Sequence, residues 1–255
     1  MKLKDKTILI TGGGSGIGLE GVKQFLEQGA KVIITGRNQA KLDAAKRMHP
    51  SITAINSDVA SQVDAQALFS QVKAMGGIDI LYNNAGVLAK PLNLGTPSNK
   101  HFEDAQNEMN INYLAVVRMN NLFIDMLKAR AESAIINTTS VLSYQPINLS
   151  PTYSASKVAL RFYTDSLRAH LGLMHSKVKV FELAPPAVAT EMADGIDAKI
   201  IAPEKLVKKL IDGLKADNYT IRVGDAKAIY YLSRFLPKLA DKLVNSAKNN
   251  KSLPT

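Results

Sequence analysis

The chain has 255 residues, of which 46% are hydrophobic and 21% charged, a composition that is ordinary for a globular protein with a substantial core. It contains no cysteine, which excludes disulfides and thiolate metal sites and favours a reducing compartment, the cytoplasm. The four histidines are scattered without a ligand-pair spacing, so no metal site is predicted. No stretch approaches the roughly 20 apolar residues of a membrane span. The N-terminal apolar run ends at Ile10, too early for a signal peptide.

The net charge of +10 is spread along the chain without a zinc-finger or RNA-binding signature, so nucleic acid is not an expected partner. The densest basic run, 234–251, lies near the C-terminus, where Leu236, Leu239, Leu243 and Val244 recur at helical spacing between lysines. This pattern favours a terminal helix that covers a core face and ends in a frayed basic tail. The alternative is peripheral contact of this helix with an anionic membrane or a partner.

Short apolar runs alternate with helical stretches almost from end to end. Strands are predicted at 7–11, 31–36, 51–56, 78–86, 134–140, 178–186 and 219–224. Helices are predicted at 18–29, 38–48, 61–75, 153–173 and 203–216, with two helical patterns between about 102 and 129. Ser61 is expected as a helix cap and Pro203 at a helix start, where its missing N–H is not needed.

This alternation predicts an α/β fold in which a parallel sheet carries helices on both faces. No internal repeat, low-complexity block or linker interrupts it. We therefore expect one domain over 1–225, followed by a basic helical extension and tail, 226–255.

A glycine-rich turn, TGGGSGIG (11–18), follows the first predicted strand and opens the first helix. Gly12, Gly16 and Gly18 would allow a tight turn, leave bare backbone for a pyrophosphate and permit close helix–strand packing. Phosphate oxygens bind well at a helix N-terminus. A glycine-rich turn by itself also fits a loop that needs positive φ. Its place in a strand–turn–helix unit predicts dinucleotide binding.

The end of the second strand, VIITGRN (32–38), indicates which dinucleotide binds. Gly36 stands where an acid would accept bonds from the ribose hydroxyls of NAD, and Arg37 follows it. Without the acid there is no repulsion toward a 2′-phosphate, and a guanidinium can bind that phosphate. We predict NADP(H), with NAD(H) as the alternative, because the glycine loop contributes Ser15 but no second cation.

Further motifs follow in a recognisable order: SDVA (57–60), NNAG (83–86), MNINYLA (109–115), NTTS (137–140) and YSASK (153–157). With these motifs and the glycine loop, the chain resembles the classical short-chain dehydrogenase/reductase family over about residues 5–225. The APP segment (184–186) is most similar to the branch encoded alongside Gram-positive D-alanylation operons. The resemblance implies a Rossmann-type three-layer α/β/α sandwich with a seven-stranded parallel sheet.

The resemblance implies a catalytic set of Asn112, Ser140, Tyr153 and Lys157. Tyr153 would be the general acid/base, and Lys157 and the charge of an oxidised nicotinamide would lower its pKa. Ser140 would orient the substrate oxygen, and Asn112 would hold a water that completes a proton path. Spacing alone shows that Tyr153 and Lys157 share a helix face, which an ordinary surface pair would also do.

The resemblance also implies a set of cofactor-binding residues: Gly12, Ser15, Gly16, Ile17, Gly18, Arg37, Asp58, Val59, Asn84, Ala85, Gly86, Tyr153, Lys157, Pro185, Val188 and Thr190. The chain departs from many relatives at Pro186, which stands where Gly is usual. A second proline fixes φ and removes an N–H, so any contact that needs glycine at this position is in doubt.

The residues expected near the substrate are mostly apolar: Val87, Leu88, Leu142, Tyr144, Pro146 and Met192. They favour a hydrophobic ketone, aldehyde or alcohol. We therefore expect an NADP(H)-dependent oxidoreductase that interconverts a carbonyl and a secondary or primary alcohol by hydride transfer. The alternative is a dinucleotide-binding redox sensor or scaffold without turnover. Relatives pair through the helices near 105–129 and 153–172, which implies a homodimer or homotetramer.

Overall fold

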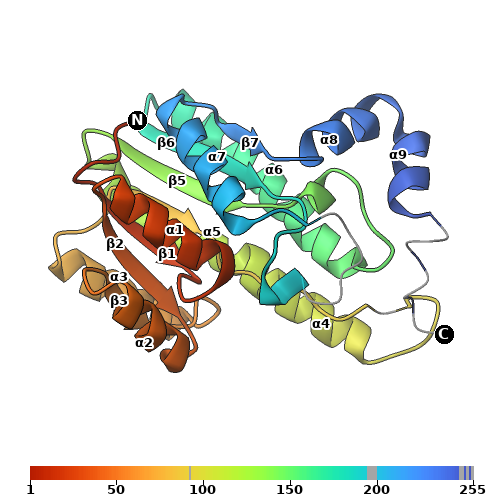
Figure 1. Ribbon diagram of the computed structural model, residues 1–255, viewed down its shortest axis with the longest axis horizontal. Coiled ribbons are helices and arrows are strands. Elements are labelled where there is room, and N and C mark those ends of the chain that lie inside the picture. The colour runs from red at the N-terminus through yellow and green to blue at the C-terminus, as the bar shows by residue number, and fades with distance from the viewer. Residues whose placement is uncertain (92, 194–199, 247–249, 251–252, 254–255) are drawn as a thin grey trace.

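A single parallel sheet forms the centre of the protein in the computed structural model, which describes residues 1–91, 93–193, 200–246, 250 and 253 (Figure 1). Within this described part the sheet has seven strands in the order β3-β2-β1-β4-β5-β6-β7, and every neighbouring pair is parallel. The strands are β1 (Thr7–Thr11), β2 (Lys31–Gly36), β3 (Thr53–Asn56), β4 (Ile80–Asn83), β5 (Ser133–Thr138), β6 (Val178–Ala184) and β7 (Thr220–Arg222). The predicted fold class is confirmed.

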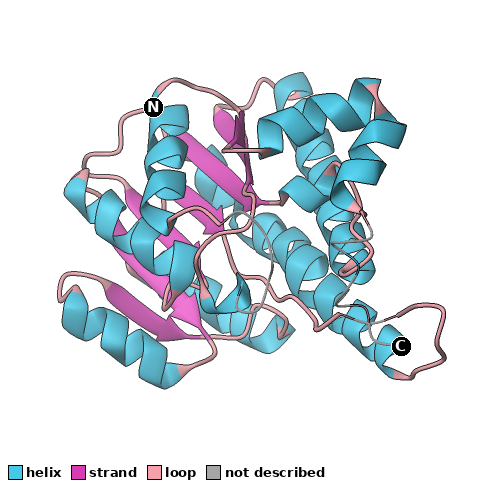
Figure 2. Ribbon diagram, turned by 45° about the vertical axis from the view of Figure 1, so that its right-hand side comes forward, coloured by secondary structure: helices cyan, strands magenta, loops and turns pink. Residues whose placement is uncertain are grey.

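Helices cover both faces of the sheet (Figure 2). They are α1 (Gly16–Glu27), α2 (Gln39–Met48), α3 (Gln62–Ala74), α4 (Lys100–Met109), α5 (Ala115–Lys128), α6 (Pro151–Leu173), α7 (Pro203–Lys215), α8 (Ala226–Phe235) and α9 (Pro237–Val244). Apolar side chains of α1, α2 and α7 pack in one core cluster, and those of α3, α5 and α6 pack in a second.

The two cores follow from the alternation of side chains along each strand. Ile8 and Ile10 of β1 belong to the first core, whereas Leu9 between them belongs to the second. Strands buried on both faces must be apolar at consecutive positions, which is why they are visible in the sequence. The predicted helix starts are also confirmed: the Ser61 hydroxyl accepts the Asp64 N–H at 3.2 Å, and Pro203 is the first residue of α7.

The strands end earlier than predicted at the carboxyl edge of the sheet. β4 ends at Asn83 rather than at 86, and β6 ends at Ala184, because Pro185 and Pro186 have no N–H to donate to a neighbouring strand. The residues released from the strands form loops at this edge, where ligands of parallel α/β sheets bind.

The two helical patterns predicted between 102 and 129 form one continuous helical segment with an irregularity. A π-helical turn, η1 (Asn110–Leu114), joins α4 to α5. Such turns occur often at functional sites. Asn112, a predicted catalytic residue, lies in the middle of this turn.

The C-terminal extension lies beyond the last strand at one end of the molecule (Figure 1). The run predicted as one helix from 234 is instead divided, because the chain leaves helical geometry at Leu236 and Pro237 starts α9. Leu236, Leu239 and Leu243 are 53%, 44% and 55% exposed, so the prediction that they cover a core face is wrong for a single chain.

Much of the predicted tail, including 247–249 and 251–252, lies outside the described residues. The domain boundary at 225 and the membrane contact of the extension stay predictions. Among the helices that the structure describes, none is long and apolar enough to cross a membrane.

Candidate active site

The predicted acid/base pair lies at the start of α6, beneath the carboxyl edge of the sheet. Lys157 is only 3% exposed, and its Nζ lies 5.5 Å from the centre of the Tyr153 ring. The same Nζ donates a hydrogen bond to the Thr138 carbonyl oxygen at 2.9 Å, at the end of β5. Because the Lys157 ammonium is buried and donates to the end of a strand, Tyr153 and Lys157 are not an ordinary pair of surface residues.

Burial sets the protonation of both groups. Burial raises the pKa of Tyr153 to about 12; the nearby Glu108 carboxylate acts in the same direction and the Ser140 hydroxyl opposes it. Burial also lowers the pKa of Lys157 to about 8, against the influence of Glu108. In the cofactor-free protein the pKa of Tyr153 is thus raised, because burial disfavours the phenolate and dominates; its lowering by Lys157 together with an oxidised nicotinamide stays a prediction.

Ser140 follows β5 and is 7% exposed. Its hydroxyl accepts the Leu142 N–H at 3.1 Å and so caps a short 3₁₀ turn, η2 (Val141–Ser143). The Val141 N–H donates to the Pro185 carbonyl at 2.8 Å. Ser140 is thus fixed between the ends of β5 and β6, with its hydroxyl beside the Tyr153 phenol.

Asn112 links the loop after β4 to the helix that carries Tyr153. Its Oδ1 accepts the Val87 N–H at 2.8 Å, and its Nδ2 donates to the Val87 carbonyl and to the Ser156 hydroxyl, both at 3.0 Å. A Cβ added at Gly86 would lie 3.1 Å from Asn112 Oδ1 and 3.5 Å from Lys157 Nζ. Both amide hydrogens of Asn112 are used, so its side chain has no free donor for the water that it was predicted to hold.

The glycine loop leaves an open cradle at the start of α1. Gly12 and Gly16 have positive φ (67° and 52°), and a Cβ at Gly18 would lie 2.2 Å from the Gly12 carbonyl oxygen. In the described structure no side chain caps α1, and no acidic residue lies in its first turn. The N–H groups at the start of α1 are therefore uncapped and uncrowded, and this helix end fits a pyrophosphate.

Thr11 connects this cradle to the NNAG motif. The Asn84 and Ala85 N–H groups both donate to the Thr11 hydroxyl at 3.0 Å, and Asn84 Nδ2 donates to the Thr11 carbonyl at 3.1 Å. The sequence analysis did not single out Thr11. Its signal was its position, directly before the first glycine of the loop.

Arg37 lies just past the end of β2, with its side chain 58% exposed. Its Nη1 is 3.9 Å from Asp58 Oδ2, a loose ion pair at the predicted adenosine end of the site. A Cβ at Gly36 would meet only Leu42, at 3.8 Å. The absence of a carboxylate at position 36 is therefore not imposed by packing.

The segment after β6 reaches over the glycine loop. Val188 pairs with Ile201 in a single bridge, and the methyl group of Thr190 is 2.9 Å from a Cβ built at Gly16. Glu191 forms an ion pair with Lys41 of α2 at 2.5 Å. The Thr190 contact brings the segment after β6 beside the cradle, and the predicted contacts of Val188 and Thr190 with a nicotinamide stay predictions.

The predicted substrate residues differ in their exposure to solvent. Leu88 and Leu142 are half-buried, Met192 is 43% exposed, and residues 194–199 beyond it lie outside the described part. The Tyr144 hydroxyl donates to Glu182 Oε1 at 3.1 Å and accepts from Arg222 Nε at 3.2 Å, so its polar group is engaged within the protein. The apolar substrate pocket stays a prediction.

A buried asparagine network, which sequence reasoning missed, fixes the frame of the site. Asn83 Nδ2 donates to Asn120 Oδ1 at 2.8 Å and to Asn137 Oδ1 at 2.9 Å, and Asn137 Nδ2 donates to Thr164 Oγ1 at 3.0 Å. The four residues come from β4, α5, β5 and α6. Their bonds hold the catalytic helix in register with the central strands.

Comparisons with known proteins agree with this geometry. The sequence model described as short chain dehydrogenase matches residues 6–200. The uncharacterized oxidoreductase DltE of Bacillus subtilis is 36% identical over 222 residues, covering 84% of this chain and 86% of the relative. A 3alpha-hydroxysteroid dehydrogenase of Mediterraneibacter gnavus is 31% identical over 243 residues, covering 92% and 91%.

Solved structures give the same result. A short chain dehydrogenase from Burkholderia cenocepacia in complex with NADP superposes with a TM-score of 0.85 at 25% identity, covering 96% of this chain and 99% of that one. A short chain dehydrogenase/reductase from Burkholderia phymatum in complex with NAD has a TM-score of 0.82 at 21% identity, covering 94% and 96%, and shares the fold.

Proposed function

The chain belongs to the short-chain dehydrogenase family, within the branch that includes DltE, and from this premise we propose that it is an NADP(H)-dependent oxidoreductase that interconverts a carbonyl and a secondary or primary alcohol. The observation that carries the proposal is the pair of half-buried Tyr153 and fully buried Lys157 beside Asn112 and Ser140, at the edge of the sheet where the glycine loop also lies. A scaffold that only bound a dinucleotide would have no use for such an acid/base pair.

The residues present fit a nicotinamide dinucleotide. The uncapped start of α1 would hold the pyrophosphate, Asp58 and Val59 the adenine, and Val188 and Thr190 the carboxamide. When bound, the nicotinamide supplies or accepts the hydride. The exposed Arg37 guanidinium, next to a glycine rather than an acid, supports NADP(H) over NAD(H).

Tyr153 and Ser140 would act on the substrate oxygen. With a pKa of about 12, Tyr153 is a neutral phenol at pH 7 and can donate its proton to the oxygen of a carbonyl under reduction. The Ser140 O–H would donate to the same oxygen and orient it. Oxidation of an alcohol needs the phenolate, so the positive charge of an oxidised nicotinamide would be required to lower the pKa of Tyr153.

The test is oxidation of NADPH, followed by absorbance, with a panel of hydrophobic ketones and aldehydes. The panel should include a 3-ketosteroid, because one relative is a 3alpha-hydroxysteroid dehydrogenase. We expect Tyr153→Phe to lower turnover by about 100-fold or more while NADPH binding is retained. Tyr231→Phe, at an exposed tyrosine of α8, is the matched control. Undiminished turnover by Tyr153→Phe would refute the mechanism, and NADPH binding without any turnover would favour the sensor or scaffold.

A further inference from the structure

Glu108, on the last turn of α4, is a buried acid that the proposed reaction does not use. The residue is 1% exposed. Its Oε1 accepts the Ala89 N–H at 2.8 Å, whereas Oε2 is buried and has no hydrogen-bond partner among the described residues. A buried carboxylate oxygen without a partner is strongly unfavourable, so its retention requires an explanation.

The position of Glu108 relates it directly to the catalytic helix. It precedes Asn112 by four residues, so the two side chains share one side of the α4–η1 segment. The loop after β4 forms a hydrogen bond to each of them: the Val87 N–H donates to Asn112, and the Ala89 N–H donates to Glu108. Because Asn112 also bonds to Ser156 of α6, Glu108 lies one turn from a fixed contact with the helix that carries Tyr153.

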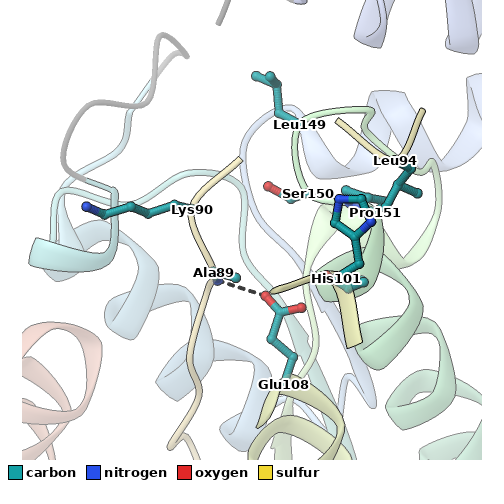
Figure 3. A pocket seen from close by; sticks show the side chains of 9 residues that line it. Ala89, Lys90, Leu94, His101, Glu108, Leu149, Ser150 and Pro151 are labelled. Atoms are coloured by element: carbon teal, nitrogen blue, oxygen red, sulfur yellow. Dashed lines mark hydrogen bonds between the residues drawn. The ribbon is translucent and has the colours of Figure 1, made fainter. Parts of the chain in front are cut away.

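A cavity lies beside the Glu108 carboxylate (Figure 3). It is small: its volume of about 10 Å³ leaves room for about one water molecule. Residues 150–152, directly before Tyr153, form one wall, and Lys90 and His101 line the cavity as well. In Figure 3 the Lys90 side chain points away from Glu108. The buried carboxylate therefore borders a space that can hold a water molecule, and one wall of this space directly precedes Tyr153 in the chain.

Glu108 acts electrostatically on both members of that pair. Its negative charge raises the pKa of Tyr153 and raises the pKa of Lys157. The charged or titratable groups near Glu108 are His101 of its own helix and Tyr153 and Lys157 of α6; Lys90 of the β4–α4 loop lines the same cavity but points away from Glu108. Among these residues, the proposed reaction requires Tyr153 and Lys157.

We propose that Glu108 is a positioning residue for proton transfer, which passes protons between the cavity beside it and the Tyr153–Lys157 pair. This inference rests on the proposed function. In carbonyl reduction, Tyr153 gives its O–H proton to the carbonyl oxygen and regains one from the Lys157 ammonium. The Lys157 amine is reprotonated by the Glu108 carboxylic acid, which takes its proton from cavity water. The hydride brings the two electrons, so each turnover consumes one solvent proton, and alcohol oxidation runs the same path in reverse.

The test compares Glu108→Gln with the wild type. Glutamine keeps an acceptor for the Ala89 N–H and the side-chain shape, but it carries neither the charge nor the proton. We expect kcat at pH 7 to fall about tenfold or more and the solvent deuterium isotope effect on kcat to rise. The basic limb of kcat/KM for reduction should move to lower pH by about one unit, because the pKa of Tyr153 falls when the negative charge is removed.

Two further variants separate this role from a merely structural one. Glu103→Gln removes the same charge from an exposed position on α4 and should leave the rate and the pH profile unchanged. Glu108→Asp keeps the charge and should restore the position of the pH profile even where the rate stays low. A Glu108→Gln variant with a raised KM and an unmoved profile would overturn the proposal and assign Glu108 to substrate binding.

A measurement without turnover distinguishes failure of this inference from failure of the proposed function. The Lys157 side chain can be titrated by NMR in cofactor-free protein labelled with ¹³C-lysine, its signal identified with Lys157→Arg. We expect the pKa of Lys157 to fall from about 8 to a lower value in Glu108→Gln. An unchanged Lys157 titration would overturn the inference whether or not a substrate is known. Absence of turnover in the wild type would count against the proposed function alone.

Discussion

At the scale of single residues, burial has the largest effect on the pKa values of Tyr153 and Lys157. Lys157 has lost most contact with water, yet its ammonium keeps one strong acceptor, the Thr138 carbonyl, and the favourable influence of the Glu108 charge. These contacts do not fully replace hydration, so the pKa of Lys157 stays near 8 rather than its ordinary 10.5. The group is thereby able to give up a proton close to neutral pH.

The lowered pKa of Lys157 predicts how stability depends on pH. Between about pH 8 and 10.5 the unfolded chain keeps a proton on Lys157 that the folded chain has lost. The free energy of unfolding should therefore rise with pH across this window, by up to about 3 kcal/mol from this residue. Urea unfolding of the wild type and Lys157→Met at several pH values measures the difference. The same pH dependence in both proteins would contradict a buried, weakly solvated Lys157.

Position 36 predicts the choice of cofactor. A side chain fits there, because a Cβ would meet only Leu42 at ordinary contact distance. We expect Gly36→Asp to weaken NADPH binding by at least tenfold, because a carboxylate would repel the 2′-phosphate, and to improve NADH binding. Gly36→Ala adds the Cβ without the charge and should change little. Equal effects of both substitutions on NADPH would mean that sterics rather than charge determine the preference.

At the scale of elements, the C-terminal extension supports the loop between Ser140 and α6. Asn245, after α9, donates to the Pro146 carbonyl at 3.0 Å and accepts the Asn148 N–H at 2.9 Å. The rings of Tyr144 and Tyr230 of α8 meet edge to face at 5.1 Å. Residues 226–246 therefore contact the active-site side of the domain rather than forming a free tail.

Removal of the Asn245 contact should loosen that loop. We expect Asn245→Ala to lower the free energy of unfolding by about 1 kcal/mol and to raise KM for the carbonyl substrate more than it lowers kcat. Asn121→Ala, exposed on α5, is the control and should change neither. Thermal unfolding and steady-state kinetics measure both effects. A normal KM in a destabilised Asn245→Ala would confine the extension to a structural role.

The elements also show what the sequence could predict. Strands buried on two faces and helices with one apolar stripe were predictable, because each pattern is local. The π-helical turn at Asn110–Leu114 was not, because the apolar pattern continues through it. Of the site, Tyr153, Lys157, Ser140 and Asn112 were predicted from the family resemblance that the motifs carry.

The supporting polar residues were not predictable from sequence. Glu108 lies in KHFEDAQNEM, which reads as a solvated helix, and only its contact with Ala89 and the packing against α6 bury it. The partners of Asn83 are 37 and 54 residues away in the sequence. Burial of a polar side chain depends on such distant contacts, which local patterns do not contain.

At the scale of the whole molecule, exposed aromatic residues on α4 and α6 indicate a covered surface. Phe102 and Phe162 are 73% and 60% exposed, which is high for phenylalanine in a single chain. The family resemblance implied pairing through the helices near 105–129 and 153–172, and we propose that this protein forms such a homodimer or homotetramer. Its mass in solution should then be two or four times the 27.6 kDa of one chain.

A charge on the exposed side of α6 should separate the proposed subunits. We expect Phe162→Asp to give a species of monomer mass by sedimentation analysis, because the carboxylate would be buried at the interface without a partner. Phe235→Asp, on exposed α8, should keep the oligomer. A wild type that sediments as a monomer would overturn the proposal.

The most direct test of the account is a fluorescence titration of the purified protein with NADPH and with NADH. The uncapped glycine-loop cradle, the exposed Arg37 and the absence of an acid at position 36 lead us to expect tight NADPH binding and NADH binding weaker by at least about tenfold. Equal or preferential binding of NADH would contradict the assigned cofactor, and binding of neither would contradict the proposed enzyme.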